Sequence, residues 1–142
     1  MLTTTSQYAL RALVKLAQLP ENTMVSGQVL ATECGIPSNY LSKIMATLCH
    51  ARMVEGVRGL NGGYKLSTPA RDIRIVKVVD LFEGIHEDPQ CLLGEDHECS
   101  DEHACSAHAR YRKVRLGYID FLRTTTIEQL SGGKQKKRQK AQ

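Results

Sequence analysis

Three of the five cysteines in the chain lie within one short segment, together with three of its five histidines. Cys91, Cys99, Cys105 and His108 offer three thiolates and one imidazole, separated by seven, five and two intervening residues. Soft thiolate ligands select zinc, copper(I) or iron–sulfur clusters. Structural zinc sites commonly pair ligands about two to four residues apart, and only the last pair here is that close. The spacing therefore favours an iron–sulfur cluster modestly over zinc.

Other interpretations of this segment remain open. A redox-thiol role, in which Cys99 and Cys105 close a disulfide, is one of them. His97 and His103 are rival ligands, although solvated loop residues are the more common explanation for such histidines. Seven carboxylates lie between residues 87 and 102. They would tend to lower the reduction potential of a bound cluster, because negative charge disfavours the addition of an electron.

Charge is distributed unevenly along the chain, whose formal net charge is +4. No lysine or arginine lies between residues 86 and 108, whereas nine basic and six acidic residues precede this segment. The last ten residues hold five basic side chains and no acidic one. Basic segments on either side of an acidic loop suggest a polyanionic partner for the body of the protein and a separate role for the loop.

The length of 142 residues fits a single compact domain that buries a core without disulfides. Arg11 and Lys15 interrupt the apolar run near the N-terminus, so we expect neither a signal peptide nor a membrane span, and a cytoplasmic protein. Thiols stay reduced in the cytoplasm, which makes the cysteines better explained as ligands or sensors than as a disulfide framework. No nucleophile–base set or phosphate-binding loop is recognisable, and we expect no enzyme.

The elements that must position the cysteine loop begin with a helix-turn-helix pattern in residues 26–50. Ser26 is suited to cap a short helix, and Gly35 stands where a left-handed C-terminal cap is needed. A second helix follows, with an apolar inner face and a polar or small outer face. Short strands at residues 53–58 and 64–67 flank the loop "GLNGG", which indicates a β-hairpin. Together these elements predict a winged helix.

The second helix of such a motif enters the major groove of DNA, which is wide enough to admit it. Asn39, Ser42 and Lys43 are placed to reach base edges. Ser38 and Tyr40 are better placed to contact phosphates. Arg58, which stands beside Gly59 in the hairpin, is suited to a narrow minor groove, because the negative potential of that groove attracts a guanidinium group. The alternative is a protein-interaction module whose polar helix face is only solvated. The candidate DNA-binding residues are Ser38, Asn39, Tyr40, Ser42, Lys43, Arg58, Asn61, Gly62 and Gly63.

Helical periodicity predicts three further helices. One covers residues 9–17, and another covers residues 75–82 and stops at Gly84, although its β-branched residues leave a strand as an alternative for its first half. A long amphipathic helix is expected from about residue 106 to residue 123. An isolated helix with an apolar stripe must bury that stripe against another surface.

Residues 1–130 resemble the family of bacterial winged-helix regulators that includes the iron–sulfur assembly regulator (IscR) and the nitric-oxide-sensing repressor (NsrR). The likeness is carried by "QYALRALVKLA", by "IPSNYLSKIMATLCHARMVEGVRGLNGGYKLS", by the three-cysteine loop and by the long helix after it. The resemblance implies that Cys91, Cys99 and Cys105 hold an iron–sulfur cluster. The ending "CSAH" resembles the branch in which a histidine three residues after the last cysteine, here His108, completes a 2Fe–2S site. The resemblance also implies a homodimer whose seam is the stripe Tyr111, Val114, Tyr118 and Phe121.

The implied protein is a homodimeric transcription regulator, most commonly a repressor, whose binding to operator DNA depends on the state of the cluster. A 2Fe–2S cluster is favoured over 4Fe–4S, since Gln7 stands where some relatives place an acidic 4Fe–4S ligand. The signal would be nitric oxide, redox state or iron supply. The alternatives are a regulator that senses thiol oxidation or zinc, and a scaffold protein that does not bind DNA. We expect a mainly α fold with a small β-hairpin wing, divided into a winged helix-turn-helix domain (1–84), a Cys/His loop (85–108), a dimerisation helix with a terminal helix (109–130) and a disordered basic tail (131–142).

Overall fold

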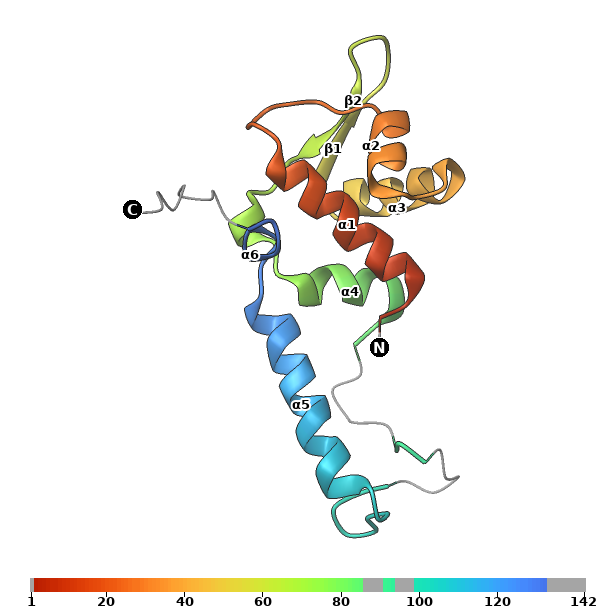
Figure 1. Cartoon of the computed structure of the whole chain (residues 1–142), viewed down its shortest axis with the longest axis vertical. Helices are drawn as coiled ribbons and strands as arrows, with labels where there is room; N and C mark the ends of the chain where they lie inside the picture. The colour runs from red at the N-terminus through yellow and green to blue at the C-terminus, as the bar shows by residue number, and fades with distance from the viewer. Residues whose placement is uncertain (1, 86–90, 94–98, 133–142) are drawn as a thin grey trace, which may run out of the picture.

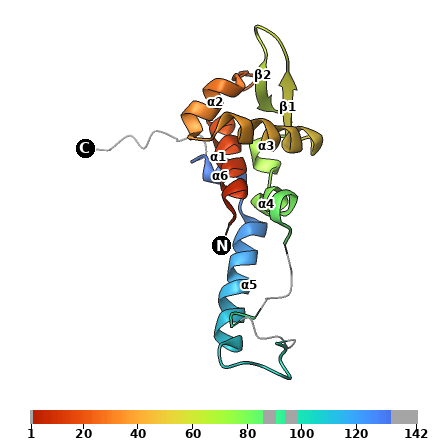
Figure 2. The same ribbon diagram turned by 90° about the vertical axis from the view of Figure 1, so that its right-hand side faces the viewer.

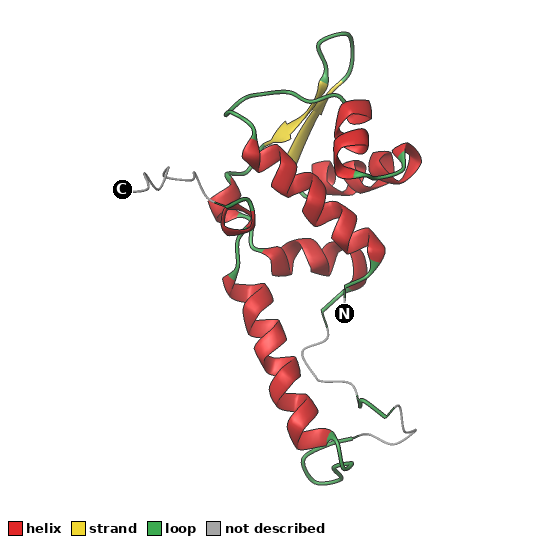
Figure 3. Ribbon diagram, in the orientation of Figure 1, coloured by secondary structure: helices red, strands yellow, loops and turns green. Residues whose placement is uncertain are grey.

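The computed structural model of the protein describes residues 2–85, 91–93 and 99–132. The rival ligand His97, five of the seven loop carboxylates and the basic tail from residue 133 lie outside these ranges. The fold is mainly helical with one β-hairpin, as predicted (Figure 3). In chain order, the elements in Figure 1 are α1 (Thr4–Gln18), α2 (Gly27–Cys34), α3 (Ser38–His50), β1 (Val54–Val57), β2 (Gly63–Leu66), the 3-10 helix η1 (Ala70–Asp72), α4 (Ile75–Glu83), α5 (His108–Thr124) and α6 (Ile127–Leu130).

Helices α2 and α3 form the predicted helix-turn-helix. The Ser26 side chain accepts a hydrogen bond from the Val29 N–H at 3.2 Å and thereby caps α2. Gly35 ends this helix at φ 63°, a left-handed conformation that glycine adopts at little cost. Burial of the apolar face of α3 decides which side of the helix points outward. The buried residues of α3 are Leu41, Ile44, Met45 and Leu48.

Strands β1 and β2 pair antiparallel and form the wing, with Val57 opposite Gly63 next to the hairpin loop. A bridge from Val25 to Tyr64 ties the segment before α2 to the same strand. A Cβ on Gly62 would lie 2.1 Å from the Val57 carbonyl oxygen, and one on Gly63 would lie 2.3 Å from the Val25 carbonyl oxygen. Both positions therefore require glycine for the fold itself. Each strand boundary differs from the predicted one by a single residue.

Helix α1 lies at the centre of the core and packs against α2, α3, α4 and α6. Its start is joined to the end of α4 through the Glu83 carboxylate. This carboxylate accepts hydrogen bonds from the Thr3 N–H and from the Ser6 hydroxyl, each at 2.8 Å, and Ser6 is fully buried. Burial raises the pKa of Glu83, but the hydrogen bonds from Thr3 and Ser6 outweigh burial and hold that pKa below its ordinary value.

Residues 75–83 form a helix, so the strand alternative for this segment is wrong. Gly84 ends the helix at φ 68°, as the sequence predicts. Helix α5 begins at residue 108, two residues later than expected, and projects away from the body in both views (Figures 1 and 2). Its two buried residues, Ile119 and Leu122, both lie in its second half. In the described part of the chain, no helix combines the length and the hydropathy needed to cross a bilayer.

Backbone hydrogen bonds join the end of α5 to the start of α4. The Ile75 N–H donates to the Thr125 carbonyl at 3.0 Å, and the Ile127 N–H donates to the Ile73 carbonyl at 2.9 Å. The Arg74 guanidinium also donates to the Arg123 carbonyl, at 2.9 Å. The C-terminal end of α5 is therefore fixed to the winged-helix body, whereas the first half of the helix extends beyond that body.

Candidate metal centre and DNA-binding surface

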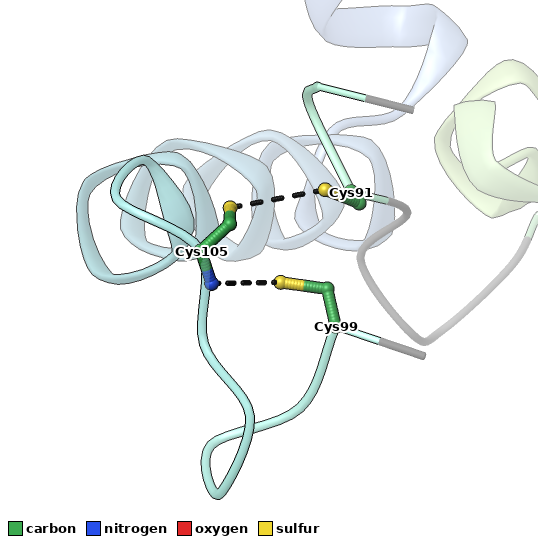
Figure 4. A group of neighbouring side chains, drawn as sticks. All are labelled: Cys91, Cys99 and Cys105. Carbon is green, nitrogen blue, oxygen red and sulfur yellow. Dashed lines mark hydrogen bonds between the residues drawn. The ribbon is translucent and has the colours of Figure 1, made fainter. Parts of the chain in front are cut away.

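The three loop cysteines converge beside the first turn of α5, at the end of the helix farthest from the wing (Figures 1 and 4). Their Sγ atoms all lie within 4.8 Å of one another. The Sγ atoms of Cys91 and Cys105 are 3.8 Å apart, and the Cys105 N–H donates to Cys99 Sγ at 3.5 Å. All three side chains are half-buried. Three converging thiols in a partly shielded position form a candidate metal centre.

His108 is the first residue of α5 and lies against this group of thiols. Its Nδ1 is 3.2 Å from Cys99 Sγ, and its side chain is only 12% exposed. The four side chains supply three soft sulfur donors and one imidazole, a set that suits an iron–sulfur cluster or zinc. His103 is exposed in the loop, and its described hydrogen bonds are those of its backbone N–H to Ser100. The donor atoms therefore fit the metal group that the sequence led us to expect.

A carboxylate and a guanidinium lie behind His108, and neither was predicted from the sequence. Asp101 Oδ1 is 2.9 Å from His108 Nε2. Arg112 Nη1 is 3.1 Å from both carboxylate oxygens of Asp101. The His108 ring and the Arg112 guanidinium hold the pKa of Asp101 below its ordinary value. A carboxylate that remains ionised can fix the orientation of the ring it contacts.

The pKa of the loop thiol Cys99 is shifted by different groups from those that act on the cysteines outside the loop. The Cys105 N–H lowers the pKa of Cys99, but burial and the adjacent Cys105 and Cys91 thiols outweigh it and raise that pKa above its ordinary value. Binding of a metal ion by thiols requires their deprotonation and so releases protons. Cys34 and Cys49 lie in α2 and α3, and burial raises the pKa of each. These two thiols are packed in the winged-helix body, away from the centre.

The outer face of α3 is open to solvent, and all five predicted contact residues on it are exposed. Tyr40 packs its ring edge against Tyr8 of α1, with the ring centroids 6.4 Å apart. The Arg11 guanidinium lies over the ring of Tyr8, 4.9 Å from the ring centroid. This contact fixes Tyr40 at the start of α3 and adds a positive charge beside it. The exposed residues on α3 are Ser38, Asn39, Tyr40, Ser42 and Lys43.

The wing carries the remaining predicted DNA contacts. Arg58 and Asn61 are exposed in the hairpin loop. Gly62 and Gly63 are only partly exposed, and the close backbone approaches described above already require their small size. A hollow of about 340 Å³ lies beside Arg58, between the wing and the capped start of α2 at Ser26. The hollow therefore adjoins a helix start, where backbone N–H groups can attract an anion.

The predicted dimer stripe on α5 divides between two faces. Val114 and Phe121 are 67% and 50% exposed, although both are apolar. Tyr118 packs against the core, and its hydroxyl is buried without a hydrogen-bond partner in the described residues. Tyr111 is half-buried. Gly117 lies one helical turn from both exposed residues, and a Cβ there would meet nothing within 4 Å, so this face can approach another surface closely.

Comparison with known proteins supports a regulator of transcription. The family Rrf2, described as an iron-dependent transcriptional regulator, matches residues 2–132. A protein of Aquifex aeolicus named as an HTH-type transcriptional regulator is 32% identical over 89% of this chain and 88% of its own. An rrf2-like HTH-type protein of Rhodobacter capsulatus is also 32% identical, over 92% and 91% of the two chains.

Solved structures of two regulators show the same fold. IscR of T. potens is 25% identical, with a TM-score of 0.68 over 92% of this chain and 85% of that one. The oxidised form of CymR from Staphylococcus aureus is 26% identical, with a TM-score of 0.71 over 92% and 95% of the chains. Regulators of this type bind DNA and are typically dimeric, and they are not enzymes. The chain belongs to the Rrf2 family of transcriptional regulators.

Proposed function

We propose that the protein is a homodimeric repressor whose binding to operator DNA is controlled by an iron–sulfur cluster. Cys91, Cys99, Cys105 and His108 would hold the cluster, with 2Fe–2S favoured over 4Fe–4S. The observation that carries the proposal is the convergence of three Sγ atoms within 4.8 Å, with a histidine nitrogen 3.2 Å from one of them. A cluster held there would supply a group that reacts with nitric oxide or oxidants.

The proposed DNA surface combines the outer face of α3 with the wing. Asn39, Ser42 and Lys43 are exposed on α3, where a helix in the major groove would present them to base edges. Arg58 extends the same surface to the adjacent minor groove. Two copies of α3 in a dimer would contact half-sites about one or more helical turns apart, roughly 34–36 Å for one turn. A small change in the angle between the two copies would therefore weaken specific binding.

The proposed coupling runs through α5. Cys105 and His108 stand immediately before and at its first turn, so ligation would order the loop against this end of the helix. The other end is fixed to α4 by the hydrogen bond between the Ile75 N–H and the Thr125 carbonyl. Because α4 and α6 both pack against α1, movement of α5 would reach the domain that carries α3. The exposed apolar pair Val114 and Phe121 would form the seam along which the two copies of α5 meet.

Anaerobic purification of the full chain tests this proposal. We expect brown protein with iron and sulfide in the ratio of a 2Fe–2S cluster, and absorption and Mössbauer spectra that change in His108→Ala. Cys99→Ala should lose the iron, whereas Cys34→Ala, the matched control outside the loop, should keep it. The affinity of the wild type for DNA selected from a random-sequence library should differ between iron-loaded and iron-free protein. An iron-free wild type, or equal affinity in both states, would contradict the proposal.

A sensor of thiol oxidation is the second candidate, and one distance favours it. The Sγ atoms of Cys91 and Cys105 are 3.8 Å apart, so a modest movement would bring them to the length of a disulfide, about 2.05 Å. Two thiols would transfer two electrons and two protons to hydrogen peroxide, which would leave as two waters. The predicted pair was Cys99 with Cys105, whereas the sulfur contact at 3.8 Å joins Cys105 to Cys91. Under this alternative, iron-free protein would bind DNA in a manner that peroxide changes and dithiothreitol restores.

A further inference from the structure

Behind the candidate metal centre, three side chains form a continuous polar chain that ends on the ring of His108. Arg112 Nη1 contacts both carboxylate oxygens of Asp101 at 3.1 Å. Asp101 Oδ1 contacts His108 Nε2 at 2.9 Å. On its other side, the ring presents Nδ1 to Cys99 Sγ at 3.2 Å. One nitrogen of the ring is thus committed to the carboxylate, and the other faces the thiols.

The secondary structure explains how this chain is assembled. His108 and Arg112 are four residues apart on α5, so their side chains project from the same face of the helix. Asp101 comes from the loop between Cys99 and Cys105 and therefore joins that loop to the helix. Any shift of Asp101 would also shift two of the three cysteines relative to His108. The polar chain consequently links the orientation of the ring to the position of the thiols.

The energetics of an exposed ion pair do not account for this arrangement. The side chains of Asp101 and Arg112 are 67% and 46% exposed, whereas that of His108 is 12% exposed. Exposed ion pairs contribute little to stability, because water screens the charges and the side chains lose entropy. The effect of Asp101 on the orientation of the His108 ring does not depend on how much the ion pair contributes to stability. A carboxylate that accepts a hydrogen bond from one ring nitrogen fixes the tautomer and the orientation of a ligating histidine.

We propose that Asp101, held by Arg112, is a positioning residue that makes Nδ1 of His108 the nitrogen ligand of the centre. The inference rests on the proposed function, since it assigns a role to residues around the proposed cluster. Asp101 accepts the hydrogen bond of Nε2–H, which leaves the lone pair of Nδ1 directed toward the sulfur atoms. Arg112 holds the carboxylate against the loop. Glu102, the next carboxylate along the chain, is exposed and makes no hydrogen bond or ion pair within the described residues, so it serves as a matched control.

The iron-free protein provides the first test. With ¹⁵N-labelled histidine at pH 8, we expect the ring of His108 to be the Nε2–H tautomer in the wild type. Asp101→Ala should give a mixture of tautomers, because nothing then holds Nε2–H. Asp101→Asn should keep the wild-type tautomer, since the Asn side-chain oxygen can still accept that hydrogen bond, and Glu102→Ala should match the wild type. A wild type in the Nδ1–H form, or an unchanged tautomer in Asp101→Ala, would overturn the inference.

The iron-loaded protein provides the second test, through a signal that folding alone would not change. With histidine labelled only at Nδ1, the pulsed EPR spectrum of the reduced wild type should show the strong ¹⁵N coupling of a directly bonded nitrogen. This coupling should be absent in His108→Ala and weakened in Asp101→Ala. Loss of iron to a chelator should be about 10–100-fold faster in Asp101→Ala than in Glu102→Ala, with Asp101→Asn between them.

The outcomes separate this inference from the proposed function. A wild type that takes up no iron contradicts the proposed function itself. A wild type with a cluster whose ¹⁵N coupling and iron loss are the same in Asp101→Ala contradicts only the role of Asp101. A cluster without coupling from the Nδ1 label contradicts the assignment of the ligand atom. Far-ultraviolet circular dichroism of iron-free Asp101→Ala should match the wild type, because the substituted side chain is exposed.

Discussion

At the scale of single residues, the wing leaves the proposed DNA contact Arg58 exposed next to Gly59. Gly62 and Gly63 lie against neighbouring carbonyl groups on the other side of the same loop. Gly59 adopts φ 114°, which side-chain-bearing residues rarely do. The guanidinium is therefore open to solvent, as the proposed contact with a DNA groove requires.

Arg58→Ala should weaken binding to the selected DNA by about 5- to 30-fold and reduce the salt dependence of the affinity by about one counterion. The reason is the loss of one cation from the DNA surface without a change in the core. Fluorescence anisotropy across a series of salt concentrations measures both quantities. Arg71→Ala removes an exposed arginine from η1, next to α6, and should leave both unchanged. Equal effects of the two substitutions would show that Arg58 contributes only to net charge.

Residue types and spacing were enough to single out the three thiols and His108, because three of the five cysteines lie in one short segment that ends at this histidine. Asp101 could not be singled out, since seven carboxylates share its segment and their spacing does not distinguish one from another. Arg112 could be placed on α5 by periodicity, but its partner comes from a loop whose path the sequence does not specify. The predicted ligands thus came from composition, whereas the groups that orient them came from tertiary structure.

At the scale of elements, the joint between α1 and α4 depends on one carboxylate. Glu83→Gln should lower the free energy of unfolding by about 1–2 kcal/mol at pH 7, because hydrogen bonds to an ionised acceptor are stronger than those to an amide. The folded-state pKa of Glu83 lies below its ordinary value of 4.5. The stabilisation is therefore complete above about that pH and is lost as the pH falls through the folded-state pKa.

Urea unfolding of the wild type and Glu83→Gln at pH 7 and at about pH 3.5 measures this effect. The difference between the two proteins should shrink in acid, where the wild-type carboxyl takes up a proton. Glu21→Gln, at an exposed turn, should behave like the wild type at both values. A difference that persists unchanged at low pH would assign the effect of Glu83→Gln to packing rather than to charge.

Helix α5 has two apolar faces for which we propose separate roles, and substitutions should distinguish them. Phe121→Asp should convert the proposed dimer to a folded monomer of 15.8 kDa, because it places a charge on the exposed face. Tyr118→Ala should instead lower the melting temperature, since Tyr118 packs against the core of its own chain. Analytical ultracentrifugation and thermal unfolding measure the two results. A dimer that survives Phe121→Asp would move the seam elsewhere on the molecule.

Local signals in the sequence predicted most of the helices and strands correctly, whereas the division of α5 between two surfaces depends on tertiary structure. The Ser26 cap, the Gly35 turn and the glycine hairpin are each defined by a few adjacent residues, so they could be recognised without tertiary information. Periodicity placed Tyr118 in one stripe with Phe121, but the stripe is wider than a single interface. Only the position of α4 beside α5 shows which side of the stripe faces inward. The winged-helix fold was therefore predictable, whereas the division of α5 between two surfaces was not.

At the scale of the whole molecule, none of residues 108–117 is buried against the chain's own body. A helix of this length, roughly three turns, is marginally stable in water by itself. In the proposed dimer, the partner's α5 would supply the packing that the first half of this helix lacks. Pairing would then stabilise the turn of α5 against which the three thiols lie. Assembly in this proposal has an order in time: the winged helix folds first, pairing stabilises the first half of α5 second, and a metal bound at the thiols is held most firmly after that.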